Sequence, residues 1–368
     1  MLAFLSVALT IYAGMHFYAL NKVWLAFPHS MWLGSVLILA GGVMTLSPLL
    51  LWLLTRQNWH GATAMASWVV YLWMGFLFLF CCTALLFDII HLLTPVLGLK
   101  WPLNHAMVLL YAGLLALAFF GYGLIEARQI RVEEVNITTP KLASGKITIA
   151  QISDLHLGAM LGDDFLQCVI GKLQEMQPDI VVATGDVVDG QGDDFNALAR
   201  RFHALQAPKG LFAITGNHEY FAGLENSLRF LHSAGFTVLR GEATAAGGII
   251  LAGVDDPSAR VMGQEVMLNA RQALAAIGKN DFIVLLKHQP VVDSATPFDL
   301  QLSGHVHGGQ IFPFGMLTRL TYGVRTGLTR LADGRLLYVS RGTGTWGPPL
   351  RLFAAPEITL ITIKSANQ

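Results

Sequence analysis

Hydrophobic and polar residues are distributed differently in the two parts of the chain. The first part contains long apolar runs that few polar residues interrupt, at about residues 2–20, 31–54, 65–87 and 106–125. Each run approaches or exceeds the ~20 residues that a helix needs to cross the hydrocarbon core of a bilayer. The pattern therefore predicts an N-terminal bundle of four transmembrane α-helices over residues 1–126.

The second part of the chain alternates short apolar segments with segments of helical spacing. Ala127–Thr139 nearly alternates apolar and polar positions, which is typical of a strand. Ile180–Ala183 is a continuous apolar run, as in a buried parallel strand, and Asp164–Met176 repeats its apolar residues with the period of a helix. Strands alternate with helices at first and dominate later. Residues 127–368 are therefore predicted to form an α/β domain of two mixed sheets packed face to face, with helices outside.

The distribution of charge supports this division. Before Glu126 the only charged residues are Lys22, Arg56, Asp88 and Lys100. Charged residues make up 13% of the whole chain, against roughly 25% in soluble domains. A lipid bilayer is therefore the expected partner of the first part. The net charge is zero and no run of Lys or Arg occurs, so nucleic acid is not expected as a partner.

The basic residues also predict an orientation in the membrane. Four spans place both ends of the bundle on the same side. That side would hold a basic residue of the middle loop and those that follow the last span, namely Arg56, Arg128, Arg131, Lys141 and Lys146. The opposite side would hold only Lys22 and Lys100. Because cytoplasmic segments are enriched in Lys and Arg, the second domain is predicted to lie in the cytoplasm.

Asp88 and His91 stand at the end of the third apolar run, about one helical turn apart. An ionisable pair inside a membrane is a functional-site hypothesis by default. The alternative is an interfacial pair just outside the hydrocarbon. We favour the interfacial interpretation and leave the functional one open.

Five groups of polar residues in the second part lie at or close to the ends of strand-like apolar runs. They are Asp154-Leu155-His156, Gly185-Asp186-Val187-Val188-Asp189, Gly216-Asn217-His218-Glu219, His288, and Gly304-His305-Val306-His307. Open α/β sheets bind their ligands at the carboxyl ends of the strands. Oxygen and imidazole ligands suit ions such as Mn²⁺, Fe or Zn²⁺. A hydrolytic site with two such ions needs a carboxylate that bridges them across ~3.5–4 Å and a water acidified by both. The pattern predicts this kind of site, with Asp186 as the bridge.

The order and spacing of these five groups resemble the calcineurin-like metallophosphoesterase superfamily. The match runs from Asp154 to His307. The extended block Gly304–Gln310 and the later block Ser340–Gly344 look like the branch of that superfamily that carries N-terminal membrane segments. The resemblance implies a four-layer αββα sandwich for the second domain, which agrees with the strand pattern.

The resemblance also implies roles for the site residues. One metal ion would be bound by Asp154, His156, Asp186 and His307, and the other by Asp186, Asn217, His288 and His305. Asp186 and His218 would be catalytic, with His218 touching the substrate phosphate together with Asn217, or protonating the leaving oxygen. Asp189 is not expected to bind a metal ion and would orient its loop.

Arg341 has two interpretations. Arginine binds phosphate through two parallel hydrogen bonds, so Arg341 could contact the substrate. A solvated or fold-stabilising arginine is about equally consistent with its position in the sequence.

The function implied is that of a membrane-anchored dimetal phosphoesterase. It would hydrolyse a phosphate mono- or diester or a pyrophosphate bond by attack of a metal-bridging hydroxide. Four spans exceed what an anchor requires, which suggests a lipid or lipid-linked substrate. The alternatives are a membrane transporter or sensor with a regulatory metal-binding domain, and a metal-binding module without catalysis. Against a transporter, the apolar runs lack charged residues except near Asp88, and no pair of broken helices in matched halves is evident.

Overall fold

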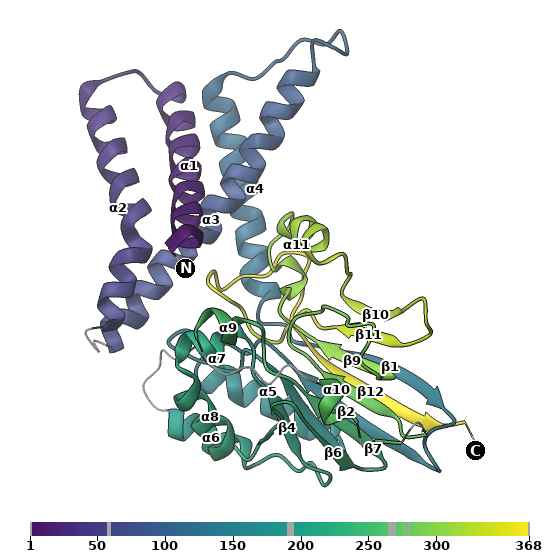
Figure 1. The fold of residues 1–368 in the computed structure, drawn as a ribbon. Helices are drawn as coiled ribbons and strands as arrows, with labels where there is room; N and C mark the ends of the chain where they lie inside the picture. Colours follow the sequence, from purple (N-terminus) through teal and green to yellow (C-terminus); the bar gives the residue numbers. More distant parts are fainter. Residues whose placement is uncertain are drawn as a thin grey trace. The chain divides into compact units, whose positions relative to one another are not determined.

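The computed structural model describes residues 2–56, 60–189, 195–263, 270–275, 277–278 and 280–366. The chain divides into two compact units. One comprises Met1–Ile125 with Gly347–Leu352, and the other comprises Glu126–Trp346 with Phe353–Gln368. The first unit is helical, and the second combines strands and helices (Figure 1).

The helical unit contains four helices. They are α1 (Leu2–Ala26), α2 (Met31–Arg56), α3 (His60–Leu93) and α4 (His105–Glu126). Within the described residues, three stretches are long and apolar enough to cross a membrane, namely Met31–Leu54, Gly61–Leu93 and His105–Glu126. The prediction of four spans is therefore supported for three of them. The predicted span at residues 2–20 falls within α1, and its crossing of a membrane stays a prediction.

Polar groups of α1 and α3 satisfy each other within the helical unit. The hydroxyl of Tyr18 donates a hydrogen bond of 2.6 Å to the Asp88 carboxylate, which also forms an ion pair with Lys22. The ring of His91 instead lies 5.0 Å from that of Trp101. The hydroxyl and the ammonium group that bind Asp88 thus come from α1, a pairing that the sequence did not reveal.

The segment Gly347–Leu352 folds with α3 and α4, although it lies far from both in the sequence. The amide of Arg351 donates a hydrogen bond of 3.0 Å to the carbonyl of Gly123. The side chain of Leu350 occupies the space beside Gly75, where a Cβ atom would lie 2.4 Å from it. The absence of a side chain at Gly75 in α3 therefore leaves room for Leu350.

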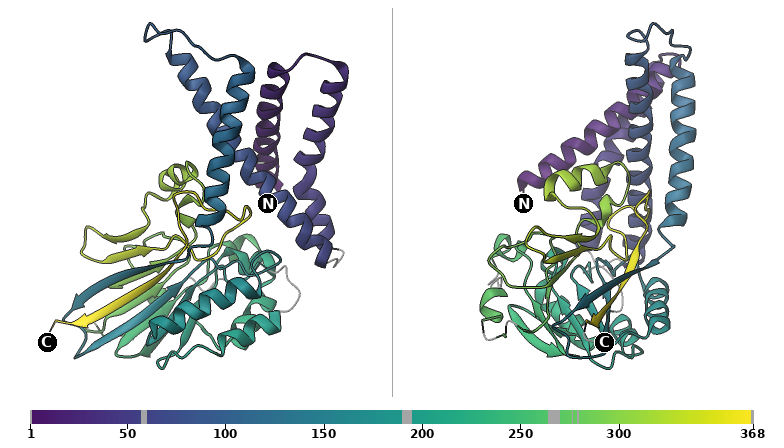
Figure 2. Two further views of the ribbon diagram at one scale, coloured as in Figure 1. Left: turned by 180° about the vertical axis from the view of Figure 1, so that it is seen from behind. Right: turned by 90° about the vertical axis from the view of Figure 1, so that its right-hand side faces the viewer.

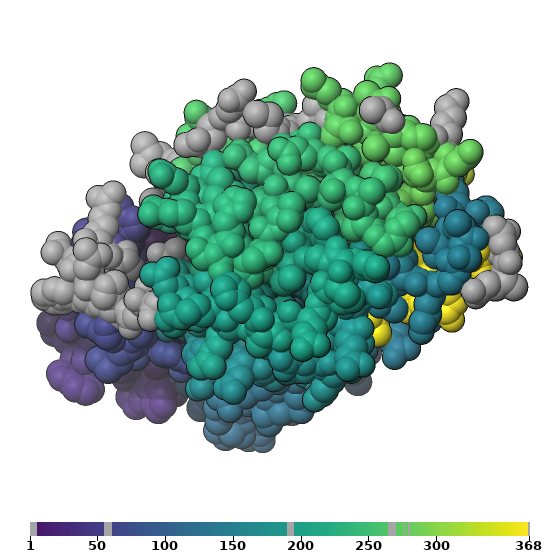
Figure 3. All heavy atoms as spheres, turned by 90° about the horizontal axis from the view of Figure 1, so that it is seen from below, coloured from purple at the N-terminus to yellow at the C-terminus, as the bar shows by residue number. Residues whose placement is uncertain are grey.

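The α/β unit contains two six-stranded sheets (Figure 2). The order in the first sheet is β1 (Arg131–Thr139), β12 (Glu357–Ser365), β2 (Lys146–Ile152), β3 (Ile180–Thr184), β4 (Leu211–Ile214) and β5 (Thr237–Val238). The order in the second is β10 (Gly327–Arg330), β11 (Leu336–Val339), β9 (Leu300–Ser303), β8 (Ile283–Leu286), β7 (Ile249–Gly253) and β6 (Glu242–Ala246). Each sheet contains parallel and antiparallel neighbours, so the prediction of two mixed sheets is confirmed. In Figure 3 the yellow C-terminal strand β12 is seen among the blue residues of its neighbours.

Apolar side chains fill the space between the two sheets and cover their outer faces. Ile149 of the first sheet and Leu302 of the second belong to the shared inner core. The outer face of the first sheet packs against α5 (Asp163–Met176), α6 (Phe195–Phe202) and α8 (Leu224–Ser233). The outer face of the second packs against the short α10 (Ala270–Ala273). The sequence predicts a longer helix at about residues 265–277, but residues 264–269 lie outside the described residues.

The strands of both sheets end at the polar groups that the sequence singled out. In the first sheet β2, β3 and β4 lead to Asp154, Asp186 and Asn217. In the second sheet β8 and β9 lead to His288 and His305. The fold thus delivers side chains from both sheets to one shared region at the carboxyl ends of parallel strands.

Candidate metal centre

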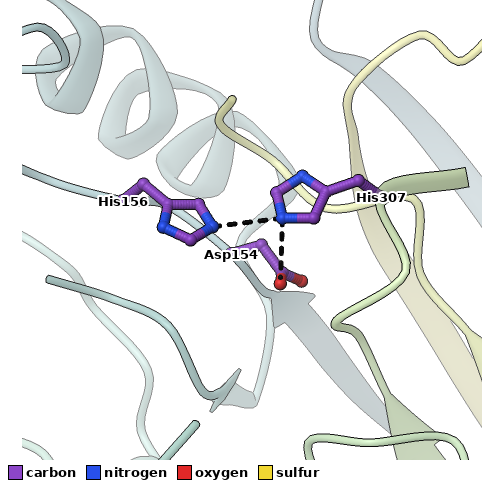
Figure 4. Close-up of side chains that lie close together, drawn as sticks. All are labelled: Asp154, His156 and His307. Atoms are coloured by element: carbon purple, nitrogen blue, oxygen red, sulfur yellow. Dashed lines mark hydrogen bonds and ion pairs between the residues drawn. The ribbon is translucent and has the colours of Figure 1, made fainter. Parts of the chain in front are cut away.

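Carboxylate and imidazole groups from both sheets converge in clusters of three residues. In the first cluster the Nε2 atom of His307 lies 3.1 Å from His156 Nε2 and 3.4 Å from Asp154 Oδ1 (Figure 4). In the second, His288 Nε2 lies 3.1 Å from Asp186 Oδ2 and 3.2 Å from His305 Nδ1. In each cluster the ligand atoms lie within 4.8 Å of one another, so each could hold a metal ion.

The backbone at these positions adopts an uncommon conformation. The φ angles are 54° at Asp154, 50° at His156, 53° at Asp186, 72° at His305 and 50° at His307. Residues other than glycine rarely enter this left-handed region, and each instance costs about 1–3 kcal/mol. The five residues lie directly beyond the strands, so the left-handed turns set the direction in which these side chains project.

The second ring nitrogen of three histidines has its own hydrogen-bond partner. His156 Nδ1 lies 2.7 Å from Asp189 Oδ1, and His288 Nδ1 donates to the carbonyl of Thr184 at 2.8 Å. His305 Nε2 lies 2.6 Å from the hydroxyl of Tyr322. Such contacts fix the orientation of a ring and leave the other nitrogen as a ligand. In all three the remaining nitrogen faces the cluster.

Asn217 supplies an observation that favours bound metal ions. Its Oδ1 atom is buried and has no hydrogen-bond partner in the described part of the chain. An unpaired buried acceptor costs about 1–3 kcal/mol, and a cation would satisfy it. Amide oxygen, carboxylate and imidazole are also the ligand types that divalent transition metals accept. The residue set therefore fits the pair of ions that the sequence predicts.

A buried carboxylate connects the loops after β3 and β4. Glu219 Oε2 accepts hydrogen bonds from the amides of Asp186, at 2.9 Å, and Gly216, at 2.7 Å, and Oε1 accepts one from Val187 at 2.7 Å. Glu219 lies at the third position of the short helix α7 (Asn217–Ala222), where a glutamate can return to the preceding loop. Glu219 belongs to one of the five polar groups of the sequence, but its sequence position alone does not indicate this role.

The two loops approach each other so closely that a side chain would not fit between them. A Cβ atom at position 216 would lie 2.2 Å from Asp186 Oδ1. Gly216 therefore lets the backbone after β4 reach the Asp186 carboxylate, and the amide of His218 then donates a hydrogen bond of 2.8 Å to Asp186 Oδ1.

The electrostatic environment fixes the charges of the central groups. Burial alone would raise the pKa of the Asp186 carboxyl, but the rings of His288 and His218 hold it well below its ordinary value. Asp186 is therefore a carboxylate, as a metal ligand must be. Burial would lower the pKa of His218, but the carboxylates of Asp186 and Asp189 overcome this effect and raise it to about 9.

Asp189 has a larger role than the sequence indicated. One oxygen, Oδ1, lies 2.7 Å from His156 Nδ1 and 2.8 Å from His218 Nδ1. It therefore orients a predicted ligand and the predicted proton donor at once. Around the His218 ring lie the exposed side chains of Phe221 and Trp346, with centroids 5.6 Å and 5.8 Å away.

Arg341 is engaged with protein groups. Its guanidinium lies 2.7 Å from Glu357 and pairs with Glu133, and its Nε–H donates to the carbonyl of Ala355 at 3.0 Å. These contacts correspond to the fold-stabilising interpretation. The substrate-binding role stays a prediction that they do not support.

Comparison with known proteins agrees with the chemistry of the site. The family model described as calcineurin-like phosphoesterase matches residues 147–309. The chain is 40% identical over 255 residues to an uncharacterized metallophosphoesterase of Aquifex aeolicus (strain VF5), covering 68% of this chain and 98% of that relative. It is 34% identical over 263 residues to a transmembrane protein with metallophosphoesterase domain of Danio rerio, covering 67% of this chain and 60% of that relative.

A solved structure of a purple acid phosphatase from yellow lupin (Lupinus luteus) seeds is a more distant match. It has a TM-score of 0.34 and 12% identity, over 62% of this chain and 55% of that one. The chain thus spans about half of that structure, and the likeness is too remote to support any conclusion about function.

The fold and site define a phosphoesterase-type metal centre on an α/β scaffold. The chain belongs to the calcineurin-like metallophosphoesterase family. The predicted family and enzyme class, a metal-dependent hydrolase of phosphoric ester bonds, are confirmed. The three apolar helices and the transmembrane relative indicate association with a membrane.

The role of Glu219 can be tested by Glu219→Gln. The amide nitrogen of glutamine cannot accept a hydrogen bond, so at least one buried backbone amide loses its acceptor. Each such loss costs about 1–3 kcal/mol, which should lower the thermal midpoint measured by calorimetry. The matched control is Glu134→Gln, at an exposed position of β1, which should leave the midpoint unchanged. Equal midpoints for the two variants would show that Glu219 does not hold the loops.

Proposed function

We propose that the chain is a membrane-anchored phosphoesterase that uses two divalent transition-metal ions, Mn, Fe or Zn. The first ion would be held by Asp154, His156, Asp186 and His307, and the second by Asp186, Asn217, His288 and His305. The grouping of Asp154, His156 and His307 in one cluster, and of Asp186, His288 and His305 in another, carries the proposal. The unpaired Asn217 Oδ1 supports it independently.

The bound ions would supply Lewis acidity toward the phosphoryl group and make water a nucleophile at neutral pH. The chain's own residues would contact the substrate and supply the proton. His218 would hold a proton, because the carboxylates of Asp186 and Asp189 favour its charged form. Its Nδ1 is bound to Asp189, so Nε2 is the atom that can contact the phosphate or protonate the leaving oxygen. Asn217 would contact the substrate beside it.

We further propose residues 1–126 as a transmembrane domain, with α1 as its fourth span, and residues 127–368 as the catalytic domain, an αββα sandwich. The length and apolar character of the helices support this division. The substrate would be a phosphate mono- or diester or a pyrophosphate held at the bilayer. Phospholipids and lipid-linked pyrophosphates are the first compounds to screen, because membrane helices keep the site close to them.

The central position of Asp186 predicts the effect of Asp186→Asn. The substitution removes a charge that both proposed ions share, so turnover should be abolished and the metal content should fall. The measurement is hydrolysis of an aryl phosphate by the full chain in detergent, with elemental analysis of the same samples. Asp281→Asn, in a solvent-exposed loop, is the matched control. An Asp186→Asn enzyme that retains its activity would contradict the proposal, and a wild-type chain without hydrolase activity on any phosphate ester would favour a transporter or sensor.

His218→Ala tests the proton donor. General acid catalysis contributes typically ~10²–10⁴ in rate, so kcat should fall by about that factor while the metal content stays nearly intact. The loss should be smaller for an aryl phosphate, whose leaving group needs little protonation, than for an alkyl phosphate. His232→Ala, at an exposed position of α8, is the control. Loss of a metal ion from the His218 variant would instead identify a ligand, and unchanged kinetics would leave a packing role only.

The orientation can be tested with a reporter fused after Gln368. The basic residues on the proposed cytoplasmic side predict a cytoplasmic catalytic domain. A fluorescent reporter that matures only in the cytoplasm should therefore be active, and alkaline phosphatase, which requires an oxidising compartment, should be inactive. The reverse pattern would place the domain on the opposite side.

A further inference from the structure

Helix α11 (Phe314–Tyr322) belongs to the α/β unit (Figure 1), and several of its apolar side chains are exposed. None of its nine residues, all of which the structure describes, is buried. Leu320 is 83% exposed and Met316 64%. We define the outer face of α11 as the exposed apolar side chains of Phe312, Phe314, Met316, Leu317 and Leu320. A cluster of this kind on a protein surface indicates an interaction site.

The opposite side of α11 rests directly on the loop that carries the proposed metal ligands. A Cβ atom at Gly309 would lie 2.1 Å from the Cα atom of Gly315, and one at Gly315 would lie 2.7 Å from the carbonyl oxygen of Gly308. The Gly308-Gly309 pair that follows His307 therefore allows backbone contact with the helix. A displacement of α11 would therefore shift this loop directly, because no side chain lies between the two backbones.

The last residue of α11 reaches the metal centre itself. The hydroxyl of Tyr322 lies 2.6 Å from His305 Nε2, the ring nitrogen that points away from the cluster. His305 Nδ1 faces His288 Nε2 at 3.2 Å. The position of Tyr322 therefore helps to set the orientation of a proposed ligand.

Charge favours an anionic lipid surface as the occupant of the outer face. Between Asp299 and Asp333 the sequence contains Arg319, Arg325 and Arg330 but no acidic residue. Arg319 lies on α11 itself and is exposed. Apolar side chains flanked by cations are the composition of helices that lie in the headgroup region of anionic membranes. The apolar helices of the same chain keep this surface near a bilayer, which raises its effective concentration there.

We propose that the outer face of α11 inserts into the headgroup region of the bilayer and that Tyr322 transmits its position to His305. This inference deepens the proposed function and rests on it only for the role of His305 at the metal centre. Lipid contact itself can be measured without any activity. Tyr322 is a positioning residue, because it acts through His305.

The lipid contact can be tested with a photoreactive diazirine amino acid at position 320 of the full chain. The chain is placed in nanodiscs of phosphatidylcholine with phosphatidylserine, and adducts are identified by mass spectrometry. Lipid adducts should form at position 320, and fewer should form without phosphatidylserine. The control is the same probe at position 146, an exposed site at the opposite end of β2 from Asp154, where no adducts should form.

Two outcomes of that experiment would overturn the inference. One is the absence of lipid adducts at position 320 from an active enzyme, which would leave the proposed phosphoesterase function intact. The other is cross-linking to a second copy of the chain in place of lipid, which would make the outer face a protein interface. Lipid adducts from a chain without phosphoesterase activity would support the contact and contradict the proposed function instead.

The link to the metal centre is tested by Tyr322→Phe, which removes only the hydroxyl. Loss of a group that orients a metal ligand typically weakens metal affinity or activity by ~10–100-fold, so a chelator should strip metal at correspondingly lower concentration. Lipid adducts at position 320 and the thermal midpoint should be unchanged. Tyr338→Phe, which removes a hydroxyl of β11 that is bound to Glu357 of β12, is the matched control for metal retention. Equal metal retention by wild type and Tyr322→Phe would show that Tyr322 does not transmit the position of α11 to His305.

Discussion

The proposed metal centre depends on left-handed backbone turns at the ends of strands from two sheets. Five of the proposed ligands occupy this conformation, and each costs about 1–3 kcal/mol. The surrounding structure must offset that cost. Glu219, which is fully buried, contributes by accepting hydrogen bonds from the backbone amides of Asp186, Val187 and Gly216. These bonds hold the loops after β3 and β4 together. Gly216 allows the close approach that this arrangement requires.

Much of this architecture could be predicted from the sequence, because local patterns encode it. The predicted strand Ile180–Ala183 lies within β3, and the predicted helix Asp164–Met176 lies within α5. The five polar groups follow apolar runs, so their convergence at strand ends followed from the rule for α/β sheets. The helix α11 was not predicted. Its apolar side chains are exposed and none of its nine residues is buried, so its sequence matches neither an amphipathic core helix nor a strand. The contacts of Asp189 with two histidines and of Tyr322 with His305 also escaped prediction, because they join residues distant in sequence.

The block from Gly304 to Gln310 gains a physical explanation from the structure. His305 and His307 project toward the two clusters, and Gly308-Gly309 admits the backbone of α11. The side-chain amide of Gln310 makes two hydrogen bonds of 2.9 Å to the backbone of Trp346, whose ring lies beside His218. One short segment thus connects proposed ligands, the proposed proton donor and the exposed helix, which gives the proposed transmission from α11 a physical route.

The central claim is that these residues hold two metal ions in a phosphoesterase. Seven proposed ligand side chains exceed what one tetrahedral site uses, and we propose that Asp186 serves both ions. The most direct measurement is the metal content of the purified full chain, by elemental mass spectrometry, alongside its activity during titration with a strong chelator. The account predicts close to two transition-metal ions per chain and complete inactivation by the chelator. A single ion per chain, or full activity in excess chelator, would contradict it.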